Sequence, residues 1–97
     1  MANPLTPDAV VKAPPPDRER IAESIRRLAA QRGAEKSICP SEVARELGGE
    51  SWRSLMRPVR DTALELARQG EIEVLRKGKP VEPGEVRGVI RLRIAAR

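Results

Sequence analysis

Hydrophobic residues recur at helical spacing in two long stretches of the chain, and the first lies between residues 17 and 33. Arginines and glutamates occupy most of the other positions there, so this stretch predicts an amphipathic helix. Asp17 is suited to cap the N-terminus of this helix, and Gly33 is suited to end it. The apolar face consists of Ile21, Ile25, Leu28 and Ala29.

A second, shorter helix is predicted over residues 40–47. Pro40 fits the first helical position, Glu42 the third, and Gly48 or Gly49 the end. The three residues "KSI" just before it have room to form a short strand.

The second long stretch predicts a third helix, which ends at Gly70. Pro58 cannot donate a backbone hydrogen bond to residue 54. We therefore expect a kink at Pro58, or regular helix that starts just before it. The apolar positions at helical spacing are Trp52, Leu55, Val59, Ala63 and Leu66.

Strict alternation replaces helical spacing near the end of the chain. "EIEVLRK" places Ile72 and Val74 on one side, and "RGVIRLRI" does the same for Ile90, Leu92 and Ile94, so each predicts a half-buried strand. The Gly- and Pro-containing residues 78–86 between them predict a hairpin loop.

The register of this hairpin can be predicted from its charges. If Lys77 pairs with Arg87, Glu73 faces Arg91 and Glu71 faces Arg93. Opposite charges across a strand pair are stabilising. Arg91 and Arg93 are therefore interpreted as structural partners of the two glutamates.

The order of elements predicts an α+β fold, the winged helix. It has a three-helix helix-turn-helix core, a two-stranded β-hairpin wing and room for a short strand before the second helix. Ninety-seven residues suffice for one small domain. We assign residues 18–97 to it and residues 1–17, with five of the nine prolines, to a flexible tail.

Four motifs support this fold independently. "ICPSEVAREL", "WRSLMRPVR", "GEIEVLRKGKPVEP" and "RGVIRLR" resemble, in this order, the signature of a bacterial family of small winged-helix proteins of unknown function. The resemblance covers residues 20–93 and implies a winged-helix fold, but no activity, ligand or catalytic residue. Val89 departs from the signature, in which a proline follows the glycine, and this concerns only the start of the last strand.

Composition excludes several functions. One cysteine and no histidine cannot form a structural zinc site, an internal disulfide or a Ser-His or Cys-His pair. A single aromatic residue cannot form a base-stacking platform. The sequence contains no acid/base pair, metal set or phosphate loop, so we expect no enzyme, cofactor or metal. It contains no signal or membrane-spanning pattern, so we expect a cytoplasmic protein.

The net charge of +5 favours an anionic partner. The excess lies in residues 18–33, 51–70 and 71–97, with net charges of +3, +2 and +3. We predict that the third helix reads the major groove of double-stranded DNA and that the wing contacts phosphates, in a role such as transcriptional regulation. The predicted helix contacts are Arg53, Ser54, Arg57 and Arg60; the predicted wing contacts are Arg76, Lys77, Lys79 and Arg87.

Several of these residues also have a purely structural interpretation. The helix arginines can form a solvated face, with Arg57 and Asp61 paired one turn apart. Arg26 and Arg27 of the first helix are better explained by solubility than by phosphate contact. Trp52 is predicted to pack in the core, mostly against the first helix and the wing strands. Cys39 is interpreted as a small buried or capping residue rather than a reactive thiol.

A second function remains open, a protein-interaction module that binds a protein partner or forms a homodimer without contacting nucleic acid. Its motivation is the Pro-rich tail together with two apolar residues predicted to face outward, Leu64 and Leu75.

Overall fold

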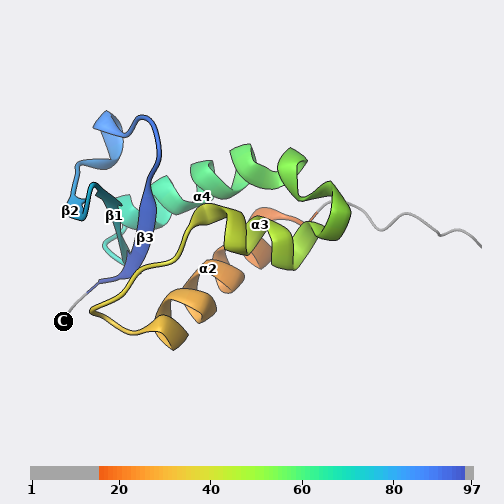
Figure 1. Cartoon of the computed structure of the whole chain (residues 1–97), viewed down its shortest axis with the longest axis horizontal. Helices are drawn as coiled ribbons and strands as arrows, with labels where there is room; N and C mark the ends of the chain where they lie inside the picture. The colour runs from red at the N-terminus through yellow and green to blue at the C-terminus, as the bar shows by residue number, and fades with distance from the viewer. Residues whose placement is uncertain (1–15, 96–97) are drawn as a thin grey trace, which may run out of the picture.

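Three α-helices pack together beside a small antiparallel sheet in the structure, a computed structural model that describes residues 16–95 (Figure 1). The α+β class is as predicted. The tail predicted for residues 1–17 lies, apart from its last two residues, outside the described residues. The elements are α2 (Arg18–Arg32), α3 (Pro40–Gly48), the 3₁₀ helix η1 (Gly49–Leu55), α4 (Met56–Arg68), β1 (Ile72–Arg76), β2 (Lys79–Pro80), the 3₁₀ turn η2 (Pro83–Glu85) and β3 (Arg91–Ile94).

Helix α2 begins and ends where its sequence predicts. The Asp17 side chain accepts a hydrogen bond from the Arg20 backbone N–H at 2.9 Å, which satisfies one of the free donors of the first turn. At the other end, the Gly33 N–H donates to the Ala29 carbonyl. Ile21, Ile25 and Ala29 are buried on the face that the spacing assigned to the core.

Helix α3 also confirms its prediction, with Pro40 in the first position. The Glu42 carboxylate accepts a hydrogen bond from the Cys39 N–H at 3.0 Å, so Cys39 is a capping residue. Gly48 allows η1 to approach closely, because a Cβ there would lie 2.7 Å from Leu55 Cδ1.

Regular α-helix begins at Met56, two residues before Pro58. This is the second of the two outcomes expected for Pro58. Its nitrogen lies in the first turn, where backbone donors have no partner within the helix. The helix ends at the predicted glycine, where the Gly70 N–H donates to Ala67 and the Glu71 N–H to Leu66.

The sheet has three strands in the order β2-β1-β3. The predicted two-stranded hairpin is therefore wrong. The predicted loop contains β2, which pairs with β1 through the two-residue turn at Lys77 and Gly78. The short strand expected before the second helix is reduced to one bridge, in which Ile38 and Leu92 exchange hydrogen bonds of 2.7 and 2.8 Å.

The predicted register between β1 and β3 is also wrong, by two residues. Glu73 lies opposite Arg93 and forms an ion pair with it, and Leu75 lies opposite Arg91. The pairing of Lys77 with Arg87 does not form, because the chain after Lys77 turns into β2 and returns through η2. A shift of two keeps every side chain on its predicted face. Ile72, Val74 and Leu92 are accordingly buried.

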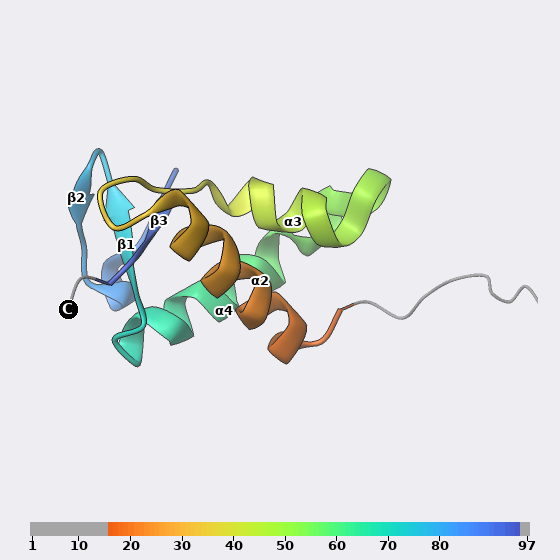
Figure 2. The same ribbon diagram turned by 90° about the horizontal axis from the view of Figure 1, so that it is seen from below.

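The core lies between the helices and one face of the sheet, and Figure 2 shows the sheet at one end of the three helices. Leu55, Val59, Ala63 and Leu66 are buried, as predicted. Leu75 is not an outward residue, however, because it is only 5% exposed. It lies on the other sheet face, and Arg76, Val89 and Arg91 line the hollow beside it. Leu64 is half-buried against the core.

Candidate nucleic-acid interface

The arginines of α2 are largely consumed by ion pairs. Arg26 binds the Glu71 carboxylate with two nitrogens, at 2.7 and 3.3 Å, and this hydrogen bonding raises the pKa of Arg26. Arg27 pairs with Glu46, so the sequence prediction missed the carboxylate partners of both arginines. Four of the five ion pairs among residues 16–95 use α2; the five are Arg18–Glu65, Arg26–Glu71, Arg27–Glu46, Arg32–Glu42 and Arg93–Glu73.

These ion pairs leave an unequal charge distribution. Residues 51–91 contain nine basic and six acidic side chains, and three of the six acids are already paired with Arg18, Arg26 and Arg93. The other three, Asp61, Glu82 and Glu85, have no ion pair among the described residues. Positive charge is therefore compensated on α2 and remains in excess around α4 and the sheet.

On α4, the two predicted contact residues have different surroundings. Arg57 is exposed in the first turn, and within residues 16–95 it forms no ion pair with Asp61. Arg60, one turn later, donates from Nη1 to the Gly88 carbonyl at 2.8 Å. Arg60 therefore fastens the loop of residues 86–90 to α4, while Arg57 keeps its donors toward solvent.

Arg76 reaches the same loop from β1. Its Nη2 lies 3.5 Å from the position that a Cβ on Gly88 would take, so its guanidinium group packs against the Gly88 backbone. Arg60 from α4 and Arg76 from β1 thus both contact Gly88. Arg91, at the start of β3, is held by the segment before α3. Its Nε and Nη2 donate to the Ser37 hydroxyl and carbonyl at 2.7 and 2.9 Å.

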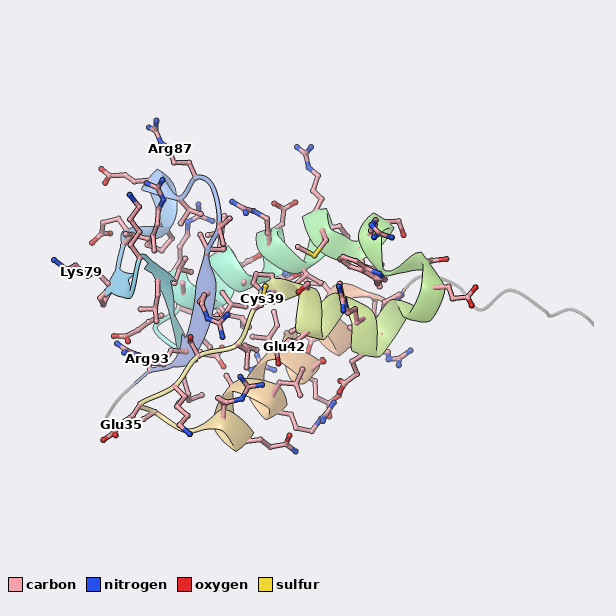
Figure 3. All side chains as sticks on the ribbon, in the orientation of Figure 1. Glu35, Cys39, Glu42, Lys79, Arg87 and Arg93 are labelled. Carbon is pink, nitrogen blue, oxygen red and sulfur yellow. The ribbon has the colours of Figure 1, made fainter. Side chains whose placement is uncertain are left out.

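The remaining basic residues of the sheet project outward. Lys77 and Gly78 both have positive φ, of 54° and 82°, as in the two-residue turns that suit the twist of a hairpin. Lys79 follows in β2, and Arg87 lies in the returning loop. Figure 3 shows the side chains of Lys79 and Arg87 extending away from the body of the molecule. Lys77, Lys79 and Arg87 therefore form an exposed basic rim.

Two of the predicted helix contacts precede α4, because regular helix begins only at Met56. Arg53 and Ser54 lie in η1, whose 3₁₀ geometry rotates each residue by about 120° instead of 100°. The Ser54 hydroxyl donates to the Ser51 carbonyl at 2.8 Å. Arg53 stacks on Trp52, with its guanidinium carbon 4.6 Å from the ring centroid.

Trp52 packs against the hydrophobic core, as predicted, but it is only half-buried there. It belongs to η1, which lies at the end of the helices away from the sheet rather than beside the strands (Figures 1 and 2). The guanidinium carbon of Arg45 lies 4.4 Å from its ring centroid. Sequence reasoning missed Arg45, because only folding brings α3 against η1.

Residues 18–95 match a family described as proteins of unknown function, DUF3253. The chain belongs to the DUF3253 family. A search among curated proteins found no match. The described part of this DUF3253 chain contains no helix long and apolar enough to cross a membrane. Residues 16–95 also contain no group of three or more His, Cys, Asp or Glu side chains that could hold a metal ion.

Proposed function

We propose that this DUF3253 protein is a winged-helix protein that binds double-stranded DNA and regulates transcription. In this proposal α3, η1 and α4 form the helix-turn-helix, and β1, β2, η2 and the loop before β3 form the wing. The strand pairing supports the fold assignment, because Ile38 ahead of α3 borders β3 and β3 borders β1.

The unequal charge compensation is the observation that carries the DNA proposal. The arginines of α2 bind carboxylates of α3, α4 and the start of the sheet, while the basic side chains of α4 and the wing retain free donors. A duplex offers one negative charge per roughly 1.7 Å of its axis, and cations that neutralise phosphates release counterions. Nucleic acid binding therefore gains most free energy on the surface of α4 and the wing, where the basic side chains have few carboxylate partners.

Each basic residue receives a role from its contacts. Arg57 is the exposed arginine of the first turn of α4, so we assign it to base edges in the major groove. Lys77, Lys79 and Arg87 are assigned to phosphates. Arg60 and Arg76 are positioning residues, because they hold the loop that carries Arg87.

A titration with duplex DNA at low salt, followed by heteronuclear NMR, tests the proposal. We expect the amides of Arg57 and of residues 77–79 to shift, and the shifts to disappear as salt is added. The variant Arg57→Ala should weaken binding. A control at Arg20 removes one charge from α2, where the side chain has no ion pair among residues 16–95, and should leave affinity nearly unchanged. Spectra that do not respond to DNA would refute the proposal.

The protein-interaction alternative is motivated by Leu64, Leu75 and the Pro-rich tail. Leu75 is buried and Leu64 is half-buried against the core, so the two leucines expose less apolar surface than outward positions would. Its remaining motivation, the Pro-rich tail, lies outside the described residues.

A further inference from the structure

Two arginines share one indole ring at the corner between α3 and η1. Arg45 comes from α3 and Arg53 from η1, and their guanidinium carbons lie 4.4 and 4.6 Å from the centroid of Trp52. The two cations are therefore within about 9 Å of each other, both in reach of the ring's attraction for cations. We call Arg45, Trp52 and Arg53 the Trp52 stack.

Neither Arg45 nor Arg53 forms an ion pair within residues 16–95, although Glu50 lies in the same 3₁₀ helix as Arg53. The nearest acidic residues of α3 are engaged elsewhere. Glu46 accepts hydrogen bonds from Ser24 and Arg27, and Glu42 accepts from the Cys39 N–H and Arg32. Like charges so close repel each other, and the negative face of the indole offsets part of that repulsion.

Stacking leaves the hydrogen-bonding capacity of both arginines unused. A guanidinium group has five N–H donors in its plane, and contact through its face does not consume them. Arg45 and Arg53 are both exposed, and no hydrogen bond from either side chain forms within the described part of the chain. The stack thus holds two oriented sets of donors that match phosphate oxygens.

The position of the stack relative to α4 suits a DNA backbone. The stack comes from α3 and η1, before α4, whereas β1 and β2 lie near the other end of α4 (Figure 1). The loop that carries Arg87 is fastened to Arg60, one turn into α4. Helix α4 has 13 residues and is roughly 20 Å long, which exceeds the width of about 12 Å of the major groove. Contacts at the two ends of α4 can therefore reach the two strands that border one groove.

We propose that the Trp52 stack is a phosphate clamp for one strand of duplex DNA, opposite the strand that the wing contacts. The inference rests on the proposed DNA-binding function and changes the role of Arg53 from base reading to backbone contact. Trp52 itself is a positioning residue, because it holds the two guanidinium groups without touching the phosphates.

The experiment uses the full chain and the fact that Trp52 is its only aromatic residue. Intrinsic fluorescence therefore reports on the stack alone. Duplex DNA is titrated at several salt concentrations, and both the emission of Trp52 and the binding constant are recorded. The test variant is R45Q/R53Q. The matched control is R20Q/K36Q, which also removes two exposed charges whose side chains form no hydrogen bond or ion pair among residues 16–95.

We expect DNA to change the emission of Trp52 in the wild type. The slope of log binding constant against log salt should fall by about 1.8 in R45Q/R53Q, since each lost phosphate contact removes about 0.9. The control should keep the wild-type slope. R45K/R53K should also keep most of the slope, because lysine preserves the charges. Circular dichroism of each variant verifies that it is folded.

The failure of the clamp can be told apart from the failure of the proposed function. A wild-type protein that does not bind DNA refutes both. DNA binding with an unchanged slope in R45Q/R53Q and no change in Trp52 emission refutes only the clamp. An equal emission change with inorganic phosphate at the same phosphate concentration refutes the assignment to a DNA backbone.

Discussion

Helix α2 and the segment from η1 to β3 both carry an excess of arginine and lysine, but only the arginines of α2 pair mostly with carboxylates. The α2 arginines reach carboxylates from three other parts of the chain, and so contribute to tertiary structure. The basic residues of α4 and the wing either hold backbone carbonyls or remain exposed. Arginine content alone therefore does not show which surface keeps an excess of positive charge, because that depends on the carboxylates within reach of each arginine.

The largest effect on stability should come from a carboxylate that pairs with an arginine of α2. Glu46 accepts hydrogen bonds from Arg27 and from the buried Ser24. The Ser24 Oγ lies 2.6 Å from the Glu46 Oε2. Glu46→Ala leaves that hydroxyl without its partner, so we expect a loss of roughly 1–3 kcal/mol in the free energy of unfolding, measured by urea denaturation. Glu85→Ala, the control in η2, should change it by less than about 0.5 kcal/mol. Equal effects would contradict the contrast between the two regions.

The next prediction separates two arginines on one helix. Arg60→Ala removes the hydrogen bond to Gly88, and we expect a loss of about 1 kcal/mol together with faster hydrogen exchange in residues 86–90. Arg57→Ala should leave stability within about 0.5 kcal/mol and weaken DNA binding directly. If Arg60→Ala leaves the exchange of the loop unchanged, Arg60 does not position it.

Local features of this fold are the ones that the sequence predicts well. The caps of α2 and α3 depend on residues within a few positions of each other, such as Asp17 and Arg20 or Cys39 and Glu42. These interactions form wherever the helix forms, so residue type and spacing suffice to find them.

The errors arise where tertiary structure changes local geometry. The helical angle placed Trp52 in the core against the wing strands, but Trp52 lies in the 3₁₀ helix η1 and is half-buried at the edge of the core, whereas Leu55 of the same 3₁₀ helix is buried as predicted. The charge pattern of the hairpin suggested one register, yet β2 interrupts the predicted loop and moves the pairing by two residues. The partners of Arg26 and Arg27 are 45 and 19 residues away, and no local pattern identifies contacts at that separation.

A smaller effect should be found at the wing turn, where stability and binding are expected to move in opposite directions. Lys77 has a φ of 54°, a conformation that asparagine tolerates better. Lys77→Asn should therefore raise stability by about 0.5 kcal/mol, measured by thermal unfolding, while it weakens DNA binding through the lost charge. Lys79→Asn removes the same charge outside the turn and should weaken binding without that gain. Stronger binding by Lys77→Asn would show that the turn does not contact phosphate.

The smallest effect is the pH dependence of stability at Glu42, which pairs with Arg32 of α2. Partial burial opposes ionisation of Glu42, but hydrogen bonds from the Cys39 N–H and from Arg32 outweigh it and hold the pKa of Glu42 below 4.5. An acid whose pKa is lower in the folded state stabilises the fold above its unfolded pKa, and this stability is lost as the pH falls through the folded value. Wild-type stability should therefore decline below about pH 4.5 more than that of Glu42→Gln, which keeps an oxygen for the Cys39 N–H but cannot ionise. Urea denaturation at pH 7 and at successively lower pH tests this. Parallel pH profiles for the two proteins would show that the ionised form of Glu42 contributes nothing to the α2–α3 contact.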